Sequence, residues 1–224
     1  MASDLTTPGE LEDREDAGRR LAQLLLPYRR TNALVLALPR GGVVVAAPIA
    51  ERLELPLEVL IVRKIGHPAQ PEFGLGAVVE GLPPVLDTDG MIRAGISEAE
   101  LAPMIRTEQR EVERRARRYR GGRLLPDIRG RVVLLVDDGI ATGGTVRSAI
   151  KALRQRRPQK IVLAVGVAPP DTYESLRKEV DELVCLSVPT DFAAVGQFYR
   201  EFQPVSDDRV IELLNRFQRA GPAP

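Results

Sequence analysis

The chain has 224 residues, of which 44% are hydrophobic, which is enough for one large domain with a substantial core. Its 32 Lys and Arg nearly balance its 31 Asp and Glu, so no overall charge favours nucleic acid or a membrane surface as a partner. No apolar run reaches the ~20 residues of a membrane span, and no secretory segment follows Met1, so the sequence predicts a cytoplasmic protein.

The first part of the chain alternates helical and strand patterns. Apolar residues recur at helical spacing up to Leu26, and Pro27 ends that helix. Non-alternating apolar runs predict buried strands, because a strand covered on both faces needs no polar face. By these criteria we predict a helix over residues 10–26, a strand over 33–38, a helix over 43–53 and a strand over 57–62.

The segment Pro39-Arg40-Gly41-Gly42 lies between the first predicted strand and the helix after it. Two consecutive glycines leave backbone N–H groups accessible to an anion, and Arg40 adds a positive charge. In open α/β sheets, ligands bind at the carboxyl ends of the strands. The segment is therefore a candidate anion-binding loop, with a plain tight turn as the alternative.

Two cations, Arg63 and Lys64, follow the second predicted strand. They can act as charge-assisted donors to an anion, or simply lie at a solvated strand end. His67 precedes a proline and is interpreted as a loop residue, not as a general base. The glycine-containing stretch after it predicts a strand or hairpin over residues 72–79, with a partner strand over 82–86.

A long helix is predicted from Ser97 to about Tyr119, with Ser97 as its N-cap and Glu100 as the partner in a capping box. Glutamates and arginines four positions apart predict a salt-bridged, solvent-facing helix surface rather than a nucleic-acid site. A basic break with two glycines follows the helix, and its cations are Arg120 and Arg123.

The most informative stretch is a buried strand over residues 132–136, followed by D-D-G-I-A-T-G-G-T and a helix over 146–156. Glycine N–H groups, threonine hydroxyls and the start of the helix can all donate to a phosphate. The two acids can accept hydrogen bonds from sugar hydroxyls or reach a magnesium ion. This predicted phosphosugar site consists of Asp137, Asp138, Gly139, Ile140, Ala141, Thr142, Gly143, Gly144 and Thr145.

The last part of the chain continues the alternation of strands and helices. Its single cysteine, Cys185, excludes an internal disulfide and is expected to be a buried strand thiol. The non-alternating strands with helices between them predict a parallel sheet covered on both faces. The predicted elements are strands over residues 160–167 and 183–188, and helices over 171–178 and 210–218.

An apolar run, two acids and T-G-G-T resemble the signature of the type I phosphoribosyltransferases, which bind 5-phosphoribosyl 1-diphosphate (PRPP). With P-R-G-G, R-K-I-G and D-F-A-A-V-G-Q-F-Y, the pattern is similar to that of bacterial phosphoribosyltransferases of unassigned substrate over roughly residues 12–215. The resemblance implies a transferase for nucleotide salvage. It would use PRPP and magnesium to transfer a phosphoribosyl group to a nitrogenous base or related acceptor, releasing pyrophosphate. The family precedent also implies a homodimer.

The same resemblance implies a twisted parallel sheet with helices on both faces, plus a small hood lobe that holds the acceptor. We expect a single domain over residues 10–219, with the hood formed from about 68–89 and 189–204. The flanking residues 1–9 and 220–224 are expected to be disordered tails.

The resemblance also implies roles for the candidate residues. The loop from Gly139 to Thr145 would hold the 5-phosphate, and Asp137 and Asp138 would hold the ribose hydroxyls. Magnesium would be held through the pyrophosphate, with the same two acids as further ligands. The residues implied to bind pyrophosphate are Pro39, Arg40, Gly41, Gly42, Arg63 and Lys64.

Two further expectations concern the lid and the acceptor. Arg120 and Arg123 match the region of the family's mobile loop over the diphosphate, with a static connection as the alternative. Phe192 is either a base-stacking aromatic, as in the 6-oxopurine enzymes, or part of the core. Ala141 stands where those enzymes have a carboxylate and matches the adenine enzymes instead, so the acceptor stays open.

Two other functions fit the same residues. The fold also serves regulators that sense PRPP or a nucleotide without turnover, and such a protein would bind PRPP without releasing pyrophosphate. A hydrolase or salvage partner for another phosphosugar is the third hypothesis, which competition between PRPP and ribose 5-phosphate would distinguish.

Overall fold

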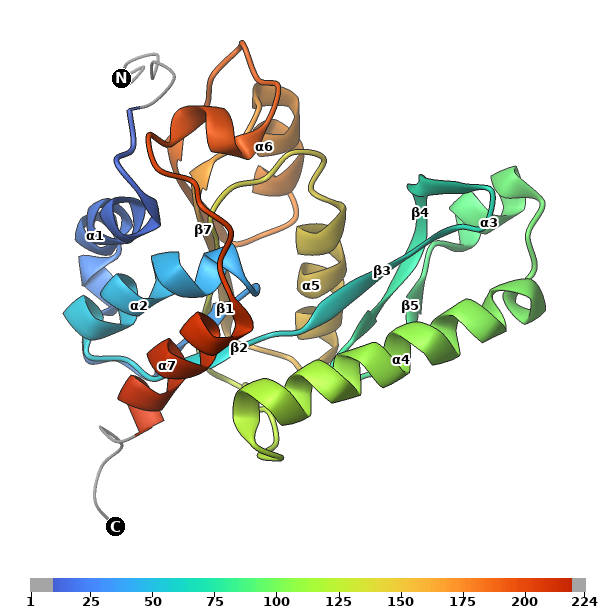
Figure 1. Ribbon diagram of the computed structural model, residues 1–224, viewed down its shortest axis with the longest axis horizontal. Coiled ribbons are helices and arrows are strands. Elements are labelled where there is room, and N and C mark those ends of the chain that lie inside the picture. Colours follow the sequence, from blue (N-terminus) through green and yellow to red (C-terminus); the bar gives the residue numbers. More distant parts are fainter. Residues whose placement is uncertain (1–9, 219–224) are drawn as a thin grey trace. The chain divides into compact units, whose positions relative to one another are not determined.

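The computed structural model describes residues 10–218, so the predicted tails at 1–9 and 220–224 lie outside the described residues (Figure 1). The chain divides into two compact units. Unit 1 contains the described residues up to Val59, together with Ile128–Gly143 and the chain from Arg157 onward. Unit 2 contains Leu60–Asp127 and Gly144–Arg156.

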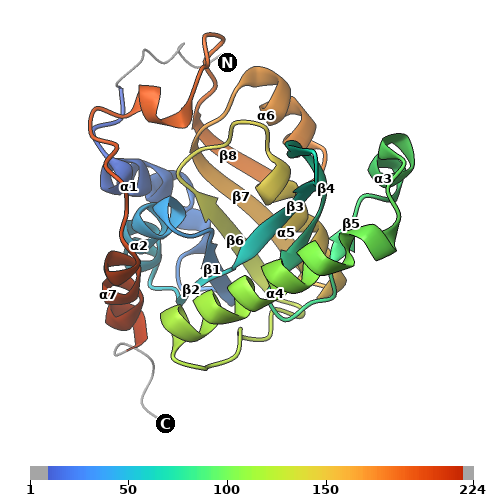
Figure 2. The same cartoon turned by 45° about the vertical axis from the view of Figure 1, so that its right-hand side comes forward.

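Unit 1 is built on a five-stranded sheet in the order β2-β1-β6-β7-β8, and every neighbouring pair is parallel (Figures 1 and 2). This confirms the predicted α/β class with a central parallel sheet. The strands are β1 (Ala33–Ala37), β2 (Leu57–Val59), β6 (Val132–Asp137), β7 (Lys160–Val167) and β8 (Glu182–Ser187).

The central strands are apolar throughout because both of their faces are covered. Every residue of β1 is buried, and so is every residue of β7 after Lys160. β1 pairs with β6 in a register that sets Ala37 opposite Val136. The carboxyl ends of these two strands therefore meet at the same edge of the sheet.

Helices of unit 1 pack around this sheet, with α1 and α2 against each other. Asp13 caps α1 by accepting a hydrogen bond from the Asp16 N–H at 2.7 Å, and Ser206 Oγ accepts one from the Arg209 N–H at 3.1 Å at the start of α7. The α-helices are α1 (Arg14–Leu24), α2 (Gly41–Leu53), α6 (Pro170–Arg177) and α7 (Asp207–Gln218), and two 3-10 turns are η1 (Leu26–Tyr28) and η2 (Val195–Phe198).

Unit 2 contains a three-stranded antiparallel sheet in the order β3-β4-β5, with α4 and α5 packed on β3 and β4. The predicted capping box of α4 is present: Ser97 Oγ accepts from the Glu100 N–H at 3.3 Å, and the Ser97 N–H donates to Glu100 Oε2 at 2.8 Å. The elements are β3 (Val62–His67), β4 (Gln70–Val79), β5 (Val85–Leu86), α3 (Thr88–Ala94), α4 (Glu98–Arg120) and α5 (Gly144–Gln155).

The strand predicted over residues 57–62 is wrong in its extent. β2 ends at Val59, and β3 begins at Val62 in the other sheet. Leu60 and Ile61 between them are fully buried, so the apolar run continues through the crossing and gives no sign of it. Helix α3 was not predicted, because Gly90 lies inside it and lowers its helix propensity.

Two smaller observations complete the fold. None of the described helices is both long and apolar enough to cross a membrane. Cys185 lies on strand β8, as predicted; it is a free thiol of a half-buried residue, and burial raises the pKa of the thiol.

Candidate functional site

The carboxyl ends of β1 and β6 bring together two segments that lie far apart in the sequence. The Leu38 N–H donates to the Val136 carbonyl at 2.9 Å and carries the pairing of the strands to their ends. A Cβ atom at Gly41 would overlap the Asp138 carboxylate, and one at Gly42 would lie 2.7 Å from the Val136 carbonyl oxygen. Glycine is therefore the residue that lets this loop pack directly against the acidic pair.

The rest of the Pro39-Arg40-Gly41-Gly42 segment forms the entry to α2. Its Pro39–Arg40 peptide bond is cis, and the Arg40 carbonyl accepts a hydrogen bond from the Val43 N–H at 3.2 Å. The Arg40 side chain is half exposed, and its Nη1 lies 3.9 Å from Oδ1 of Asp207. The segment thus presents an accessible cation beside the start of a helix.

The two acids at the end of β6 have different surroundings. Asp137 Oδ1 accepts a hydrogen bond from the Asp138 N–H at 2.9 Å, while Asp138 Oδ2 accepts one from Arg14 Nε at 2.7 Å. Burial, with the neighbouring Asp138 charge, raises the pKa of Asp137 well above its usual range. Asp138 is thus paired with a cation, whereas the surroundings of Asp137 favour its protonated form.

Two residues that were not among the predicted site residues hold Asp138 in place. Arg14 comes from α1; its guanidinium carbon lies 3.7 Å from the centre of the Phe202 ring, and its Nη1 donates to the Gln203 carbonyl at 2.9 Å. The Tyr199 hydroxyl donates to the Asp138 backbone oxygen at 2.5 Å. Burial raises the pKa of the Tyr199 hydroxyl, which stays a donor.

The turn that follows the two acids is anchored to β7 at its first residues and is exposed to solvent at its later ones. The Ile140 N–H donates to the Val167 carbonyl at 2.8 Å, and a Cβ at Gly139 would lie 2.8 Å from Val167 Cγ1. The Ala141 carbonyl accepts from Thr172 Oγ1 at 2.8 Å, while the Ala141 and Thr142 side chains are exposed. The turn is therefore held from behind and faces solvent at residues 141–142.

Gly143 ends the turn and Gly144 begins α5. Gly143 has a φ of 76°, a conformation that residues with a side chain rarely adopt. Thr145 lies in the first turn of α5, where backbone N–H groups have no partner within the helix. The predicted sequence of strand, turn and helix start is present, and its last two residues belong to unit 2.

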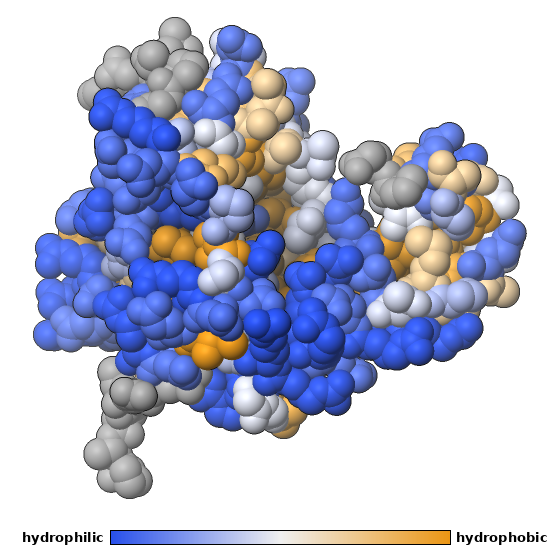
Figure 3. All heavy atoms as spheres, viewed as in Figure 1, coloured by the Kyte–Doolittle hydropathy of each residue, from blue (hydrophilic) through white to orange (hydrophobic). Residues whose placement is uncertain are grey.

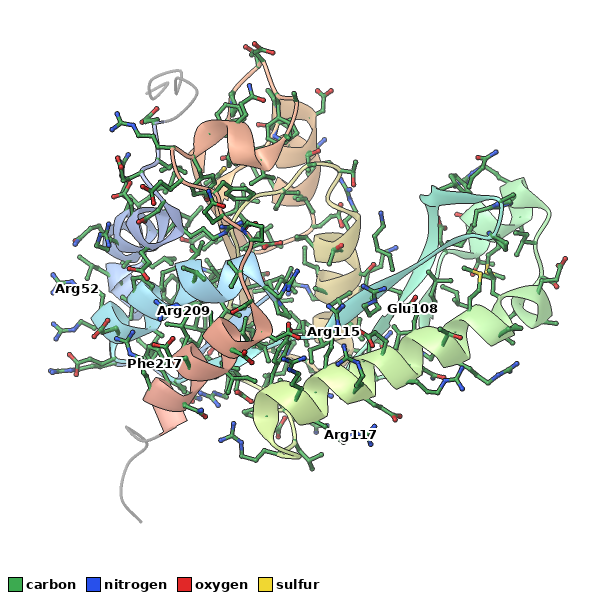
Figure 4. All side chains as sticks on the ribbon, in the orientation of Figure 1. Arg52, Glu108, Arg115, Arg117, Arg209 and Phe217 are labelled. Atoms are coloured by element: carbon green, nitrogen blue, oxygen red, sulfur yellow. The ribbon has the colours of Figure 1, made fainter. Side chains whose placement is uncertain are left out.

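Arg63 and Lys64 were predicted to lie at the carboxyl end of a strand of the parallel sheet. They lie instead within β3 of unit 2. Neighbouring residues of a strand face opposite sides, and the two cations separate accordingly. Arg63 Nε donates to Glu108 Oε2 at 2.7 Å, and Glu108 points from α4 toward β3 (Figure 4). Lys64 extends to the other side, with Cε 3.1 Å from the Cβ position of Gly144.

The two cations expected in a lid have different environments. Arg120 is the last residue of α4, is only 2% exposed and pairs with Glu80 at the end of the hairpin. Burial raises the pKa of Glu80, although the Arg120 charge opposes that shift. Arg123 lies beyond the helix and is exposed. A buried, paired Arg120 does not fit a mobile lid, whereas the role of Arg123 stays a prediction.

The remaining arginines of α4 form an ordinary exposed surface. Glu111 accepts hydrogen bonds from Arg114 at 2.8 Å and Arg115 at 2.6 Å, which lower its pKa to about 2. Figure 3 shows the outward side of this helix covered by hydrophilic residues. The predicted salt-bridged helix surface is confirmed.

Phe192 stacks on another aromatic side chain of unit 1. Its ring centre lies 5.5 Å from that of Phe198, with the rings inclined by 23°, and Phe198 is buried. This contact favours the packing interpretation of Phe192, while its part in stacking on a base stays a prediction.

Comparison with known proteins agrees with this geometry. A sequence model of the phosphoribosyl transferase domain matches residues 9–203. The chain is 44% identical over 208 residues to Rv0571c of Mycobacterium tuberculosis H37Rv, provisionally named a phosphoribosyl transferase; the match covers 93% of this chain and 47% of that protein. The chain thus spans about half the length of this relative.

Solved structures give the same picture. The crystal structure of TT1426 from Thermus thermophilus superposes with a TM-score of 0.83 at 42% identity, covering 93% of this chain and 99% of that one. A hypoxanthine phosphoribosyltransferase from Staphylococcus aureus superposes with a TM-score of 0.50 at 15% identity, covering 89% and 86%. The second likeness concerns the fold alone.

Proposed function

We propose that this chain, which belongs to the phosphoribosyl transferase domain family, binds PRPP and transfers its phosphoribosyl group to a nitrogenous base or related acceptor. The observation that carries the proposal is the packing of Gly41 and Gly42 against Asp137 and Asp138. It joins a candidate pyrophosphate loop to a candidate ribose site at one edge of the sheet, as a substrate with both groups requires.

The substrate's groups are assigned to the chain by their chemistry. The turn from Gly139 to Thr145 offers backbone N–H groups and hydroxyls to the 5-phosphate. The carboxylates of Asp137 and Asp138 accept hydrogen bonds from the ribose hydroxyls. The donors proposed for the diphosphate are the Arg40 guanidinium and the backbone N–H groups of Gly41 and Gly42, in the loop that begins at Pro39. The cations of unit 2 that the resemblance assigns to the diphosphate, Arg63, Lys64 and Arg123, stay predictions.

The reaction is a displacement at C1 of the ribose. A bond forms between C1 and a nitrogen of the acceptor, the bond from C1 to the diphosphate oxygen breaks, and that oxygen keeps the electron pair. The acceptor nitrogen loses its proton, and the leaving diphosphate gathers negative charge in the transition state. The chain's contribution is to orient both reactants and to aim cations and N–H donors at the diphosphate.

The site could bind magnesium only together with the phosphates of the substrate. Among residues 10–218 no cluster of three or more His, Cys, Asp or Glu side chains could hold a metal ion. Magnesium is usually bound by one or two carboxylates together with substrate phosphates, and Asp137 and Asp138 could supply the carboxylates. When bound, the ion would neutralise charge on the diphosphate.

The proposal is tested by calorimetric titration with PRPP and an assay of pyrophosphate release with a panel of bases. We expect wild-type protein to bind PRPP, and Asp138→Asn and Gly143→Val to lose binding while their circular dichroism stays unchanged. Full-affinity binding by both variants would overturn the site. If the protein binds PRPP but releases no pyrophosphate from it with any of the bases, the proposed transfer reaction is replaced by a sensing function.

A further inference from the structure

A pocket of about 180 Å³ lies within unit 2, between the antiparallel sheet and the first two turns of α5. Gly74 and Gly76 of β4 line one side, and Val85 and Leu86 of β5 supply an apolar wall. Its charged residues come from β3, from α5 and from the segment between β5 and α3, so the pocket is assembled by the fold of the unit and not by one loop.

Positive charge dominates the pocket. Lys64, Arg147 and Lys151 line it together with one acid, Asp87. The Asp87 carboxylate already accepts the Gly90 N–H at 3.1 Å as the cap of α3. Three cations and one carboxylate therefore line the cavity.

The position of these cations on α5 adds to the charge. Lys64 Nζ lies 3.5 Å from the Cβ position of Gly144, the first residue of a helix whose N-terminus is itself the positive end of its dipole. Arg147 and Lys151 are four positions apart, so they share one face and repel each other. An anion placed among these groups would offset the repulsion between Arg147 and Lys151 and that between Lys64 and the helix start.

The two lysines are available to such an anion. Neither the Lys64 nor the Lys151 ammonium forms an ion pair with a side chain in the described part of unit 2. The Ser148 hydroxyl donates to the Gly144 carbonyl at 2.9 Å, so the cations rather than this hydroxyl would recognise a ligand.

We propose that this pocket binds a phosphate or diphosphate group, held by Lys64, Arg147 and Lys151. This site goes beyond the proposed transfer reaction, because Arg147 and Lys151 belong neither to the acidic turn nor to the P-R-G-G segment. The anion is either the diphosphate of PRPP, in which case the pocket rests on the proposed function, or a phosphorylated ligand of separate origin.

The test is calorimetric titration of the full chain with inorganic pyrophosphate. Arg147→Gln/Lys151→Gln should weaken binding at least tenfold. The control Arg110→Gln/Arg154→Gln removes two exposed cations from α4 and α5 outside the pocket, and should change affinity by less than twofold. Thermal unfolding of each variant verifies that the fold is kept. No binding to wild-type protein, or equal affinity of the pocket variant, overturns the proposal.

A second titration distinguishes the source of the anion. If saturation with PRPP abolishes pyrophosphate binding, the pocket holds the diphosphate of PRPP; if pyrophosphate still binds, the ligand is separate, and both results support the pocket. The Asp138→Asn variant separates this inference from the proposed function. If wild-type protein binds pyrophosphate at the pocket but does not bind PRPP, the inference about the pocket is supported and the proposed transfer function is overturned.

Discussion

Arg14 Nε donates a hydrogen bond to Asp138 Oδ2 over 2.7 Å, and the two side chains are only 11% and 16% exposed. The contact joins the first helix to the carboxyl end of β6, across 124 positions of the sequence. It offsets the charge of one acid in a pair of neighbouring carboxylates. The geometry of the candidate ribose site therefore depends on a residue outside every motif of the sequence.

Replacing this arginine should weaken both the fold and the site. Arg14→Gln leaves the Asp138 carboxylate without its cation, so we expect the free energy of unfolding to fall by about 3 kcal/mol. PRPP affinity should fall at least fivefold, because Asp138 is no longer oriented. Urea unfolding and calorimetry measure the two effects. Arg19→Gln on the same helix, where the side chain is 59% exposed, is the control and should change stability by less than about 0.5 kcal/mol.

Asp137 should make stability depend on pH in an unusual direction. Its pKa in the folded protein is raised above the ordinary value of 3.8, so the stability tied to its proton is complete below that value and is lost as the pH rises through the folded pKa. Asp137→Asn should therefore be more stable than wild type at pH 8, by about 1–2 kcal/mol.

The advantage of Asp137→Asn should shrink as the pH falls toward 4, because wild-type Asp137 then carries its proton. Asparagine can still accept the Asp138 N–H, so the backbone contact is kept. Denaturant unfolding across the pH range measures the difference, with the exposed Asp191→Asn as control. A variant less stable than wild type at pH 8 would contradict the assignment.

Gly41 should be irreplaceable for a steric reason. In Gly41→Ala the new methyl group would overlap the Asp138 carboxylate and lie 2.9 Å from Arg14 Nε, so the acid must move. We expect PRPP affinity to fall at least tenfold. Gly121→Ala is the matched control, because its φ of 60° strains an alanine by about 1 kcal/mol while no atom lies within 4 Å of the new Cβ. Its affinity for PRPP should be that of wild type.

Arg120 should support stability rather than closure of a lid. Arg120→Ala leaves Glu80 buried without its cation, which should lower the free energy of unfolding by about 3–5 kcal/mol. The exposed neighbour Arg118→Ala should change it by less than about 0.5 kcal/mol. Urea unfolding decides the matter. Unchanged stability with a loss of turnover would restore Arg120 to the lid.

Local patterns predicted the parts of the fold that are local in origin. The apolar strands, the capping box at Ser97 and the glycine-rich turn after Asp138 each depend on residues adjacent in the chain. The end of β2 and the start of β3 could not be predicted, because Leu60 and Ile61 between them are as apolar as the residues of β2 and are buried. Arg14 was one arginine of a charged helix, and only its distant acid distinguishes it. Arg147 and Lys151 likewise have the spacing of an ordinary exposed helix face.

The pairing of β1 with β6 sets a limit on how this protein can change. Both strands are apolar on either face, so sliding one along the other by a single residue would still bury Val, Leu and Ala. Such a slide would carry the paired glycines about 3.3 Å away from the carboxylates. Insertions and deletions between Ala33 and Gly42 should thus be far more damaging than exchanges among aliphatic residues there, since spacing, more than identity, aligns the two loops.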